Sequence, residues 1–97
     1  MEIKKTALAG TLESSDIQIL ITKGTKGIEI ELESDVKKQF GDQICQVISK
    51  TLADFGISQA KIKAVDKGAL DCVIKARTIA AAQRAIDNSQ ELDWKVI

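Results

Sequence analysis

The chain contains no histidine among its 97 residues. Histidine is the commonest general base and the commonest transition-metal ligand in proteins, so its absence excludes a Ser-His-Asp or Cys-His arrangement within this chain. A functional serine would depend on another protein for its activation, or would itself be a site of modification. We therefore predict that the chain is not an enzyme by itself, with no catalytic residue and no metal site.

The chain also lacks clustered positive charge and long apolar runs. Lysine and arginine number 14 and aspartate and glutamate 14, so the net charge is zero, and the scattered lysines argue against nucleic-acid binding. No apolar run approaches membrane-spanning length, and the N-terminal MEIKKTALAG has no signal-peptide stretch. Cys45 and Cys72 lie far apart among apolar residues, which is typical of buried free thiols in a reducing compartment. These features predict a cytoplasmic protein that does not bind membranes.

Aromatic residues make up only 3% of the chain, so the core must be built from isoleucine, leucine, valine and alanine. The length suits one domain over residues 1–97, in which about residues 88–97 form a less regular C-terminal tail. Trp94, Val96 and Ile97 in that tail are candidates for docking onto the domain.

Alternating apolar residues predict three strands in the first third of the chain, at residues 6–12, 16–22 and 27–33. The segment TKGTKG predicts a hairpin turn between the second and third strands. A phosphate-binding loop is disfavoured there, because the P-loop spacing is missing and no helix follows. The segment ESSD, residues 13–16, predicts the tip of the preceding hairpin.

Apolar side chains at helical spacing predict a helix over residues 35–55. The members of this stripe are Val36, Phe40, Ile44, Val47, Ile48, Leu52 and Phe55. Residues 57–77 favour a third hairpin that turns at DKGA, although a helix beginning near Ala69 is an alternative, because Leu70 and Ile74 also fit helical spacing. From Thr78 the alanine-rich TIAAAQRAID predicts a second helix.

Together these elements predict an α+β fold in the order β-β-β-α-β-β-α. We expect a mostly antiparallel sheet with two helices on one face, and not a helical bundle.

The carboxylates Glu29, Glu31, Glu33 and Asp35 could hold a divalent cation. Three of them alternate along one strand face and would repel one another unless they were paired across the sheet, so a solvated face is the favoured interpretation. Such a face could also serve as an acidic docking surface.

The pair Ser14–Ser15 lies between the carboxylates Glu13 and Asp16 in a short segment of small residues. A polar turn is the ordinary interpretation of these residue types. A hydroxyl used as an attachment point must likewise be exposed on a short loop, so that a transferase can reach it and the attached arm can swing.

Three blocks in the same order over nearly the whole chain resemble one family. AGTLESSD, VKKQFGDQI and DKGALDCVIKAR are together similar to the acyl carrier (gamma) subunit of bacterial citrate lyase. The resemblance implies that Ser14, in the motif LES(G/S)D, carries a phosphodiester-linked prosthetic group derived from triphosphoribosyl-dephospho-coenzyme A. Ser15 stands where glycine is also common in the family, which implies a turn residue.

The resemblance further implies three partners. A transferase installs the group on the carrier, the alpha subunit exchanges acetyl for citrate on the thiol of the group, and the beta subunit cleaves the citryl thioester to oxaloacetate and acetyl thioester. Glu13 and Asp16 could steer the tip toward basic entrances on these enzymes. Two alternatives remain open, namely the carrier subunit of malonate decarboxylase and an unmodified protein-interaction module.

Overall fold

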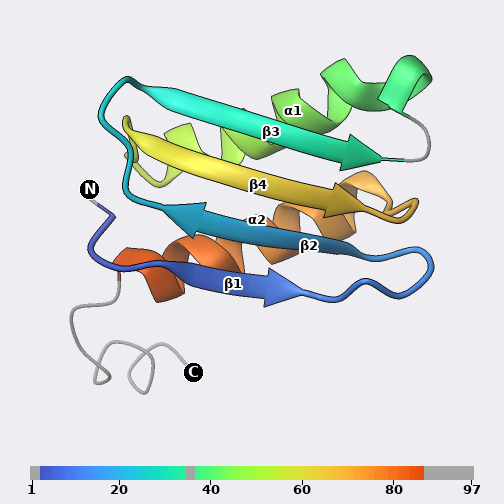
Figure 1. The fold of residues 1–97 in the computed structure, drawn as a ribbon, viewed down its shortest axis with the longest axis horizontal. Helices are drawn as coiled ribbons and strands as arrows, with labels where there is room; N and C mark the ends of the chain where they lie inside the picture. The colour runs from blue at the N-terminus through green and yellow to red at the C-terminus, as the bar shows by residue number, and fades with distance from the viewer. Residues whose placement is uncertain (1–2, 35–36, 87–97) are drawn as a thin grey trace.

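A four-stranded sheet with two helices forms the described part of the protein, residues 3–34 and 37–86 of a computed structural model. In chain order the elements are β1 (Ala7–Gly10), β2 (Ile17–Thr22), β3 (Ile28–Ser34), α1 (Lys37–Asp54), β4 (Ala60–Asp66) and α2 (Asp71–Ile86). Both helices cover the same face of the sheet, α1 behind β3 and α2 behind β1 and β2 (Figure 1). The prediction of an α+β fold that is not a helical bundle is confirmed.

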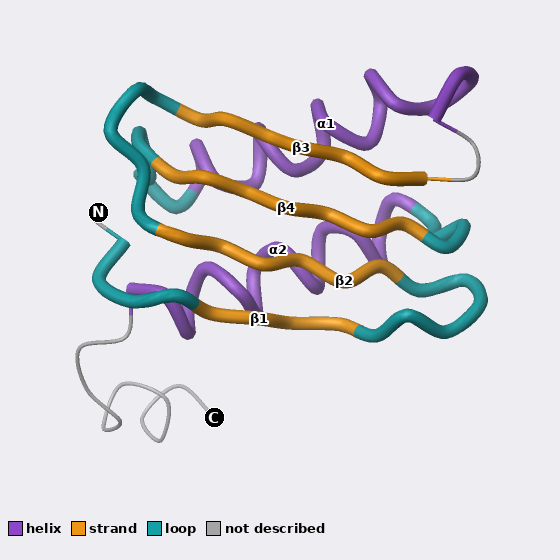
Figure 2. Tube along the Cα trace, in the orientation of Figure 1, coloured by secondary structure: helices purple, strands orange, loops and turns teal. Residues whose placement is uncertain are grey.

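The sheet has the strand order β1-β2-β4-β3 (Figure 2). The pairings β1–β2 and β2–β4 are antiparallel, whereas β3 and β4 are parallel and are joined through α1. The sheet is thus mostly antiparallel, with one parallel pair. The fourth strand along the chain therefore lies inside the sheet, between the two strands that were expected to pair directly.

The predicted hairpin turn at TKGTKG is wrong, because β4 separates β2 from β3. Residues 23–27 instead cross the beginning of β4, where the Ala60 amide donates a hydrogen bond to the Gly27 carbonyl over 3.0 Å. A Cβ at Gly24 would lie only 2.8–2.9 Å from the Ala60 backbone. Glycine at residue 24 therefore permits the chain to cross close to the backbone of β4. The sequence pattern of a turn does not reveal this requirement.

The predicted strand over residues 70–77 is also wrong, and the alternative helix is present. A strand would place Leu70, Cys72 and Ile74 on one buried face, yet Leu70 is 71% exposed and Cys72 is exposed as well. The helix α2 buries Ile74, Thr78 and alanines from its next two turns. Helical spacing therefore continues without a break from residue 70 into the alanine-rich segment, and the element order is β-β-β-α-β-α.

The core lies between the sheet and the helices and consists of aliphatic side chains, as the low aromatic content predicted. Its fully buried large apolar members are Ile3, Ile17, Ile19, Ile21, Ile48, Leu52, Ile62 and Ile74. Phe40 was predicted to join this core but is 47% exposed on α1. The cysteine prediction is correct in that neither thiol forms a disulfide and wrong in that neither is buried, because Cys45 is half-buried and Cys72 exposed.

Within residues 3–34 and 37–86, no helix is long and apolar enough to cross a membrane. The predicted C-terminal tail, its docking candidates Trp94, Val96 and Ile97, and the candidate residues Asp35 and Val36 lie outside the described residues.

The crossing at Gly24 generates a testable prediction. We expect Gly24→Ala to lower the free energy of unfolding by about 1–3 kcal/mol, because its Cβ would overlap the backbone of Ala60. Urea unfolding monitored by circular dichroism measures this change. Thr25→Ala is the matched control, because Thr25 is the exposed neighbour of Gly24. This substitution should change the free energy of unfolding little. Equal stability of the two variants would contradict the close crossing.

Candidate functional site

The loop between β1 and β2 turns on Ser14 and Ser15. The Asp16 amide donates a hydrogen bond to the Glu13 carbonyl over 3.1 Å, which closes a four-residue turn with the two serines at its centre. Ser15 has φ = +67°, and within the described residues it is the only non-glycine residue with positive φ. A positive φ at the third position alone is the pattern of a type II turn, where glycine is preferred. Ser14 occupies the second position, and its side chain is exposed.

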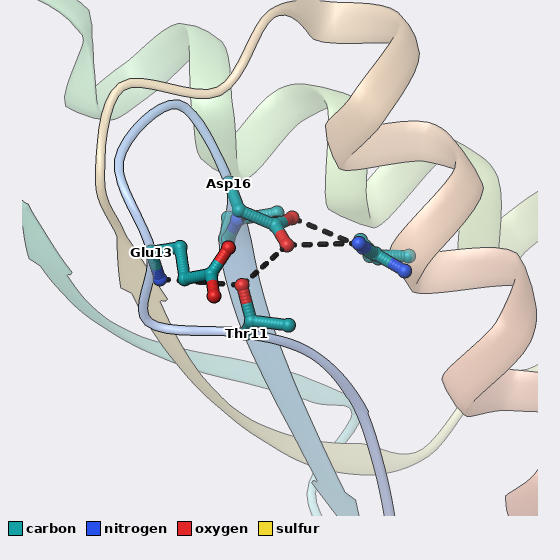
Figure 3. A network of polar contacts seen from close by, with 5 residues as sticks. Thr11, Glu13 and Asp16 are labelled. Carbon is teal, nitrogen blue, oxygen red and sulfur yellow. Dashed lines mark hydrogen bonds and ion pairs between the residues drawn. The ribbon is translucent and has the colours of Figure 1, made fainter.

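The side chain of Asp16 anchors this turn to helix α2. One carboxylate oxygen accepts hydrogen bonds from Nε of Arg77 over 3.0 Å and from the Ile17 amide over 2.7 Å. The other accepts from Nη2 of Arg77 over 2.8 Å and from the Thr11 hydroxyl over 2.6 Å. Figure 3 shows the carboxylate of Asp16 between Thr11 and the side of the helix. This two-pronged contact fixes the position of Asp16 relative to α2.

The environment of Asp16 strongly favours its charged form. Hydrogen bonds from Arg77, and next from Thr11, hold the pKa of the Asp16 carboxyl well below its usual range, despite the opposing effect of partial burial. The same contact raises the pKa of Arg77. The Asp16 side chain is 13% exposed and the Arg77 side chain 40%. Asp16 is therefore a paired anion that supports the loop.

The backbone of the loop is also attached to the connection between β4 and α2. The Ser15 amide donates to the Lys67 carbonyl over 2.7 Å, and the Lys67 amide donates to the Asp16 carbonyl over 2.8 Å. At the start of the loop Gly10 has φ = +92°, and a Cβ there would lie 1.8 Å from the Ile17 carbonyl oxygen. The turn is thus held on both sides, while the side chain of Ser14 lies exposed at its tip.

The structure brings together the three residues singled out from the sequence and gives them different surroundings. Ser14 and Glu13 are exposed at the tip, whereas Asp16 is turned inward toward α2. Thr11 and Arg77 complete the arrangement and were missed as site residues. Arg77 lies 61 residues from Asp16, and no local sequence signal connects the two. Only a helical interpretation of residues 70–77 could have suggested that Arg77 faces this loop.

The glutamates of the acidic strand β3 are exposed and two of them lie opposite lysines of β4. Glu29 lies opposite Lys61 and Glu31 opposite Lys63 in the β3–β4 register, so the repulsion expected along this face is offset by neighbouring cations. No group of three or more potential metal-ligating acidic or cysteine side chains occurs within residues 3–34 and 37–86. The interpretation as a solvated strand face therefore holds for Glu29, Glu31 and Glu33, whereas Asp35 lies outside the described residues.

The Asp16–Arg77 contact predicts a characteristic dependence of stability on pH. Because the pKa of Asp16 is depressed in the folded state, the unfolded chain takes up the proton first as pH falls below about 4. The stabilisation is therefore present above that pH and is lost as pH falls further. We expect Asp16→Asn to be less stable than the unsubstituted protein at pH 7, with a gap that narrows toward pH 2 in thermal unfolding.

Glu13→Gln is the matched control for this experiment, since it removes an exposed carboxylate from the same loop. Its difference from the unsubstituted protein should be small at every pH. A gap for Asp16→Asn that stayed constant from pH 7 to pH 2 would show that the charge of Asp16 does not stabilise the fold.

Comparisons with known proteins match the chain to acyl carrier proteins. Residues 4–85 match a family model described as ACP, the malonate decarboxylase delta subunit (MdcD). A citrate lyase acyl carrier protein from Oenococcus oeni is 66% identical over 97 residues, which cover 100% of both chains. Those of Lactobacillus helveticus and Lactiplantibacillus plantarum are 65% and 63% identical, again over 100% of both chains.

A solved structure has the same fold. It is the crystal structure of a Pseudomonas malonate decarboxylase hetero-tetramer in complex with malonate. The matched chain is 20% identical, with a TM-score of 0.70, and the alignment covers 88% of this chain and 92% of that one. At this identity the likeness establishes the shared α+β architecture.

Proposed function

The chain belongs to the family of citrate lyase acyl carrier proteins, and from this premise we propose that Ser14 is the point at which its acyl-carrying arm is attached. A member of this family is a non-catalytic carrier subunit of a multi-subunit lyase complex and holds a covalently attached prosthetic group. The observation that carries the proposal is the exposed Ser14 on a turn whose next two residues, Ser15 and Asp16, are hydrogen-bonded to the Lys67 backbone.

The turn geometry supports Ser14 over Ser15 as the attachment residue. Ser15 has positive φ, a conformation that glycine adopts without penalty, so the main requirement at residue 15 concerns the backbone. This need accounts for the family pattern LES(G/S)D, in which either glycine or serine follows the first serine. The amide of Ser15 is also engaged by Lys67. Ser14 does not have a positive φ, so its residue type is not explained by the backbone conformation. Its exposed hydroxyl is therefore the better candidate for attachment.

We propose that the arm is the phosphoribosyl-dephospho-coenzyme A group, linked to Ser14 by a phosphodiester and ending in a thiol. That thiol would hold acetyl or citryl as a thioester. The chain needs no base of its own for this role, since proton transfer takes place on the partner enzymes. Tethering makes each encounter of the acyl group with a partner site nearly intramolecular, with an effective concentration of about millimolar order.

The partners in this proposal are the alpha subunit, which exchanges acetyl for citrate, the beta subunit, which cleaves the citryl thioester, and the transferase that installs the arm. We also propose a cytoplasmic location, for which the lack of a disulfide at Cys45 and Cys72 is a supporting observation. The carrier subunit of malonate decarboxylase is the second candidate, because the matching family model has that description. Reconstitution separates the two candidates: a citrate lyase carrier supports citrate cleavage with purified citrate lyase subunits, and a malonate decarboxylase carrier supports malonate decarboxylation with purified decarboxylase subunits.

The attachment itself is tested by serine replacement. We expect Ser14→Ala to gain no mass when it is incubated with the transferase and the nucleotide donor, and to support no citrate cleavage with the alpha and beta subunits. Ser15→Gly is the matched control and should accept the arm, because glycine suits the positive φ at residue 15. Intact-mass measurement with peptide mapping localises the addition. Modification of Ser14→Ala, or of neither serine in the unsubstituted protein, would overturn the proposal.

Electrostatic steering by the tip is tested at Glu13. Charge reversal at Asp16 would break its contact with Arg77. A loss of activity in that variant could then come either from lost steering or from a displaced loop. The exposed Glu13 is the cleaner position. We expect Glu13→Lys to slow acyl exchange at low ionic strength and to approach the unsubstituted rate as salt screens the charge. An exchange rate unchanged by the substitution at every salt concentration would exclude steering by this residue.

A further inference from the structure

A groove opens beside the attachment loop, between the first half of α1 and the connection from β4 to α2. It has a volume of about 450 Å³ and is lined by Phe40, Ile44, Ala69, Leu70 and the polar residues Gln43, Asp66 and Asp71 together with Gly68. Phe40 is 47% exposed and Leu70 71%. They are two of the four large apolar side chains that are exposed in the described chain. The groove therefore presents apolar surface that residues 3–34 and 37–86 leave exposed.

Two of the polar groups that line the groove are carboxylates, those of Asp66 and Asp71, which accept hydrogen bonds. The buried carboxylate of Asp66 accepts from the Ser34 hydroxyl over 2.9 Å and from the Ala69 amide over 3.0 Å. At the rim the carboxamide of Gln43 donates to Asp71 over 3.0 Å. No lysine or arginine is among the described lining residues. The carboxylates of Asp66 and Asp71 repel a phosphate or a free carboxylate, and the groove suits a neutral chain that combines apolar methylenes with amide N–H donors.

The groove and the attachment loop share one wall. Lys67 exchanges backbone hydrogen bonds with Ser15 and Asp16 on one side, and Gly68, Ala69 and Leu70 follow it directly into the groove. In Figure 3 the attachment loop runs beside this β4–α2 connection. Three residues of chain span at most about 11 Å, so the far end of this wall lies within reach of an arm built from a nucleotide and a pantetheine chain.

We propose that this groove binds the neutral, thiol-bearing pantetheine segment of the arm while no partner subunit holds it. The inference rests on the attachment proposed for Ser14 and adds a resting place to it. The anionic phosphodiester and pyrophosphate stay outside, in water, and the amide-containing segment lies along Phe40 and Leu70. Because the arm is tethered, weak contacts suffice to populate the bound state, and a partner can withdraw the thioester without a large opposing free energy.

The accessibility of the arm thiol tests this proposal. The modified carrier is treated with iodoacetamide, and mass spectrometry separates alkylation of the arm from alkylation of Cys45 and Cys72. We expect Phe40→Ser and Leu70→Ser to accelerate alkylation of the arm. An arm that rests in the groove about three quarters of the time would react about four-fold faster once released. Leu8→Ser is the matched control, because Leu8 is 46% exposed on the strand face opposite the helices.

Chemical shifts provide a measurement that needs no substitution. The Leu70 methyl groups and the Phe40 ring should shift between the unmodified and the modified carrier, whereas the Leu8 methyl groups should not. Equal alkylation rates in all variants, or unchanged shifts at Phe40 and Leu70, would overturn the inference while leaving the attachment at Ser14 intact. Equal rates combined with slower citrate cleavage would assign the groove to a partner subunit instead.

Failure of the proposed function has a different signature. In that case the peptide around Ser14 gains no mass in the presence of the transferase, before any alkylation is measured. The two hypotheses can therefore be distinguished in one set of samples.

Discussion

The arrangement of the loop depends above all on the contact between Asp16 and Arg77. The guanidinium meets the carboxylate with two nitrogens, at 3.0 and 2.8 Å, and this contact joins the β1–β2 connection to the second turn of α2. The other supports of the loop are local or involve only the backbone. Beside this side-chain contact, the backbone hydrogen bonds to Lys67 hold the turn that presents Ser14.

This support requires a particular topology. Because β4 lies in the middle of the sheet, its end reaches the start of β2, and the chain that follows β4 passes directly beside the loop before it enters α2. An additional hairpin in place of the first turns of α2 would have put Arg77 on a strand. The position of the Ser14 turn therefore depends on the helical form of residues 71–77, which places Arg77 beside Asp16.

Much of the fold follows from local sequence patterns. The alternating isoleucines of β2 and the acidic alternation of β3 predicted strands correctly, because residues on one face of a strand share one environment along its whole length. The long stripe of α1 was equally informative, apart from Phe40. What failed was the pairing of the strands and the nature of residues 70–77. Pairing is decided by contacts between distant segments, and a short apolar run fits either period.

The same distinction applies to the site. Ser14 could be singled out from a local motif, since exposure and small neighbours are properties of a few consecutive residues. Arg77 and Lys67 could not, because their roles exist only once β4 and α2 have been placed beside the loop. The two cysteines show that local sequence can also mislead. Their apolar neighbours in the sequence suggested burial, yet the face that Cys72 occupies on α2 is exposed.

The two ends of the described chain lie at the opposite side of the molecule from the Ser14 loop (Figure 1). The Lys4 and Lys5 amides both donate to the Ala85 carbonyl, over 2.8 and 3.1 Å, so the first residues are fastened to the last turn of α2. A fluorescent protein or a surface linker joined ahead of residue 3 would consequently project away from the loop that carries Ser14. Immobilised in this way, the carrier would still expose Ser14 to the surrounding solution.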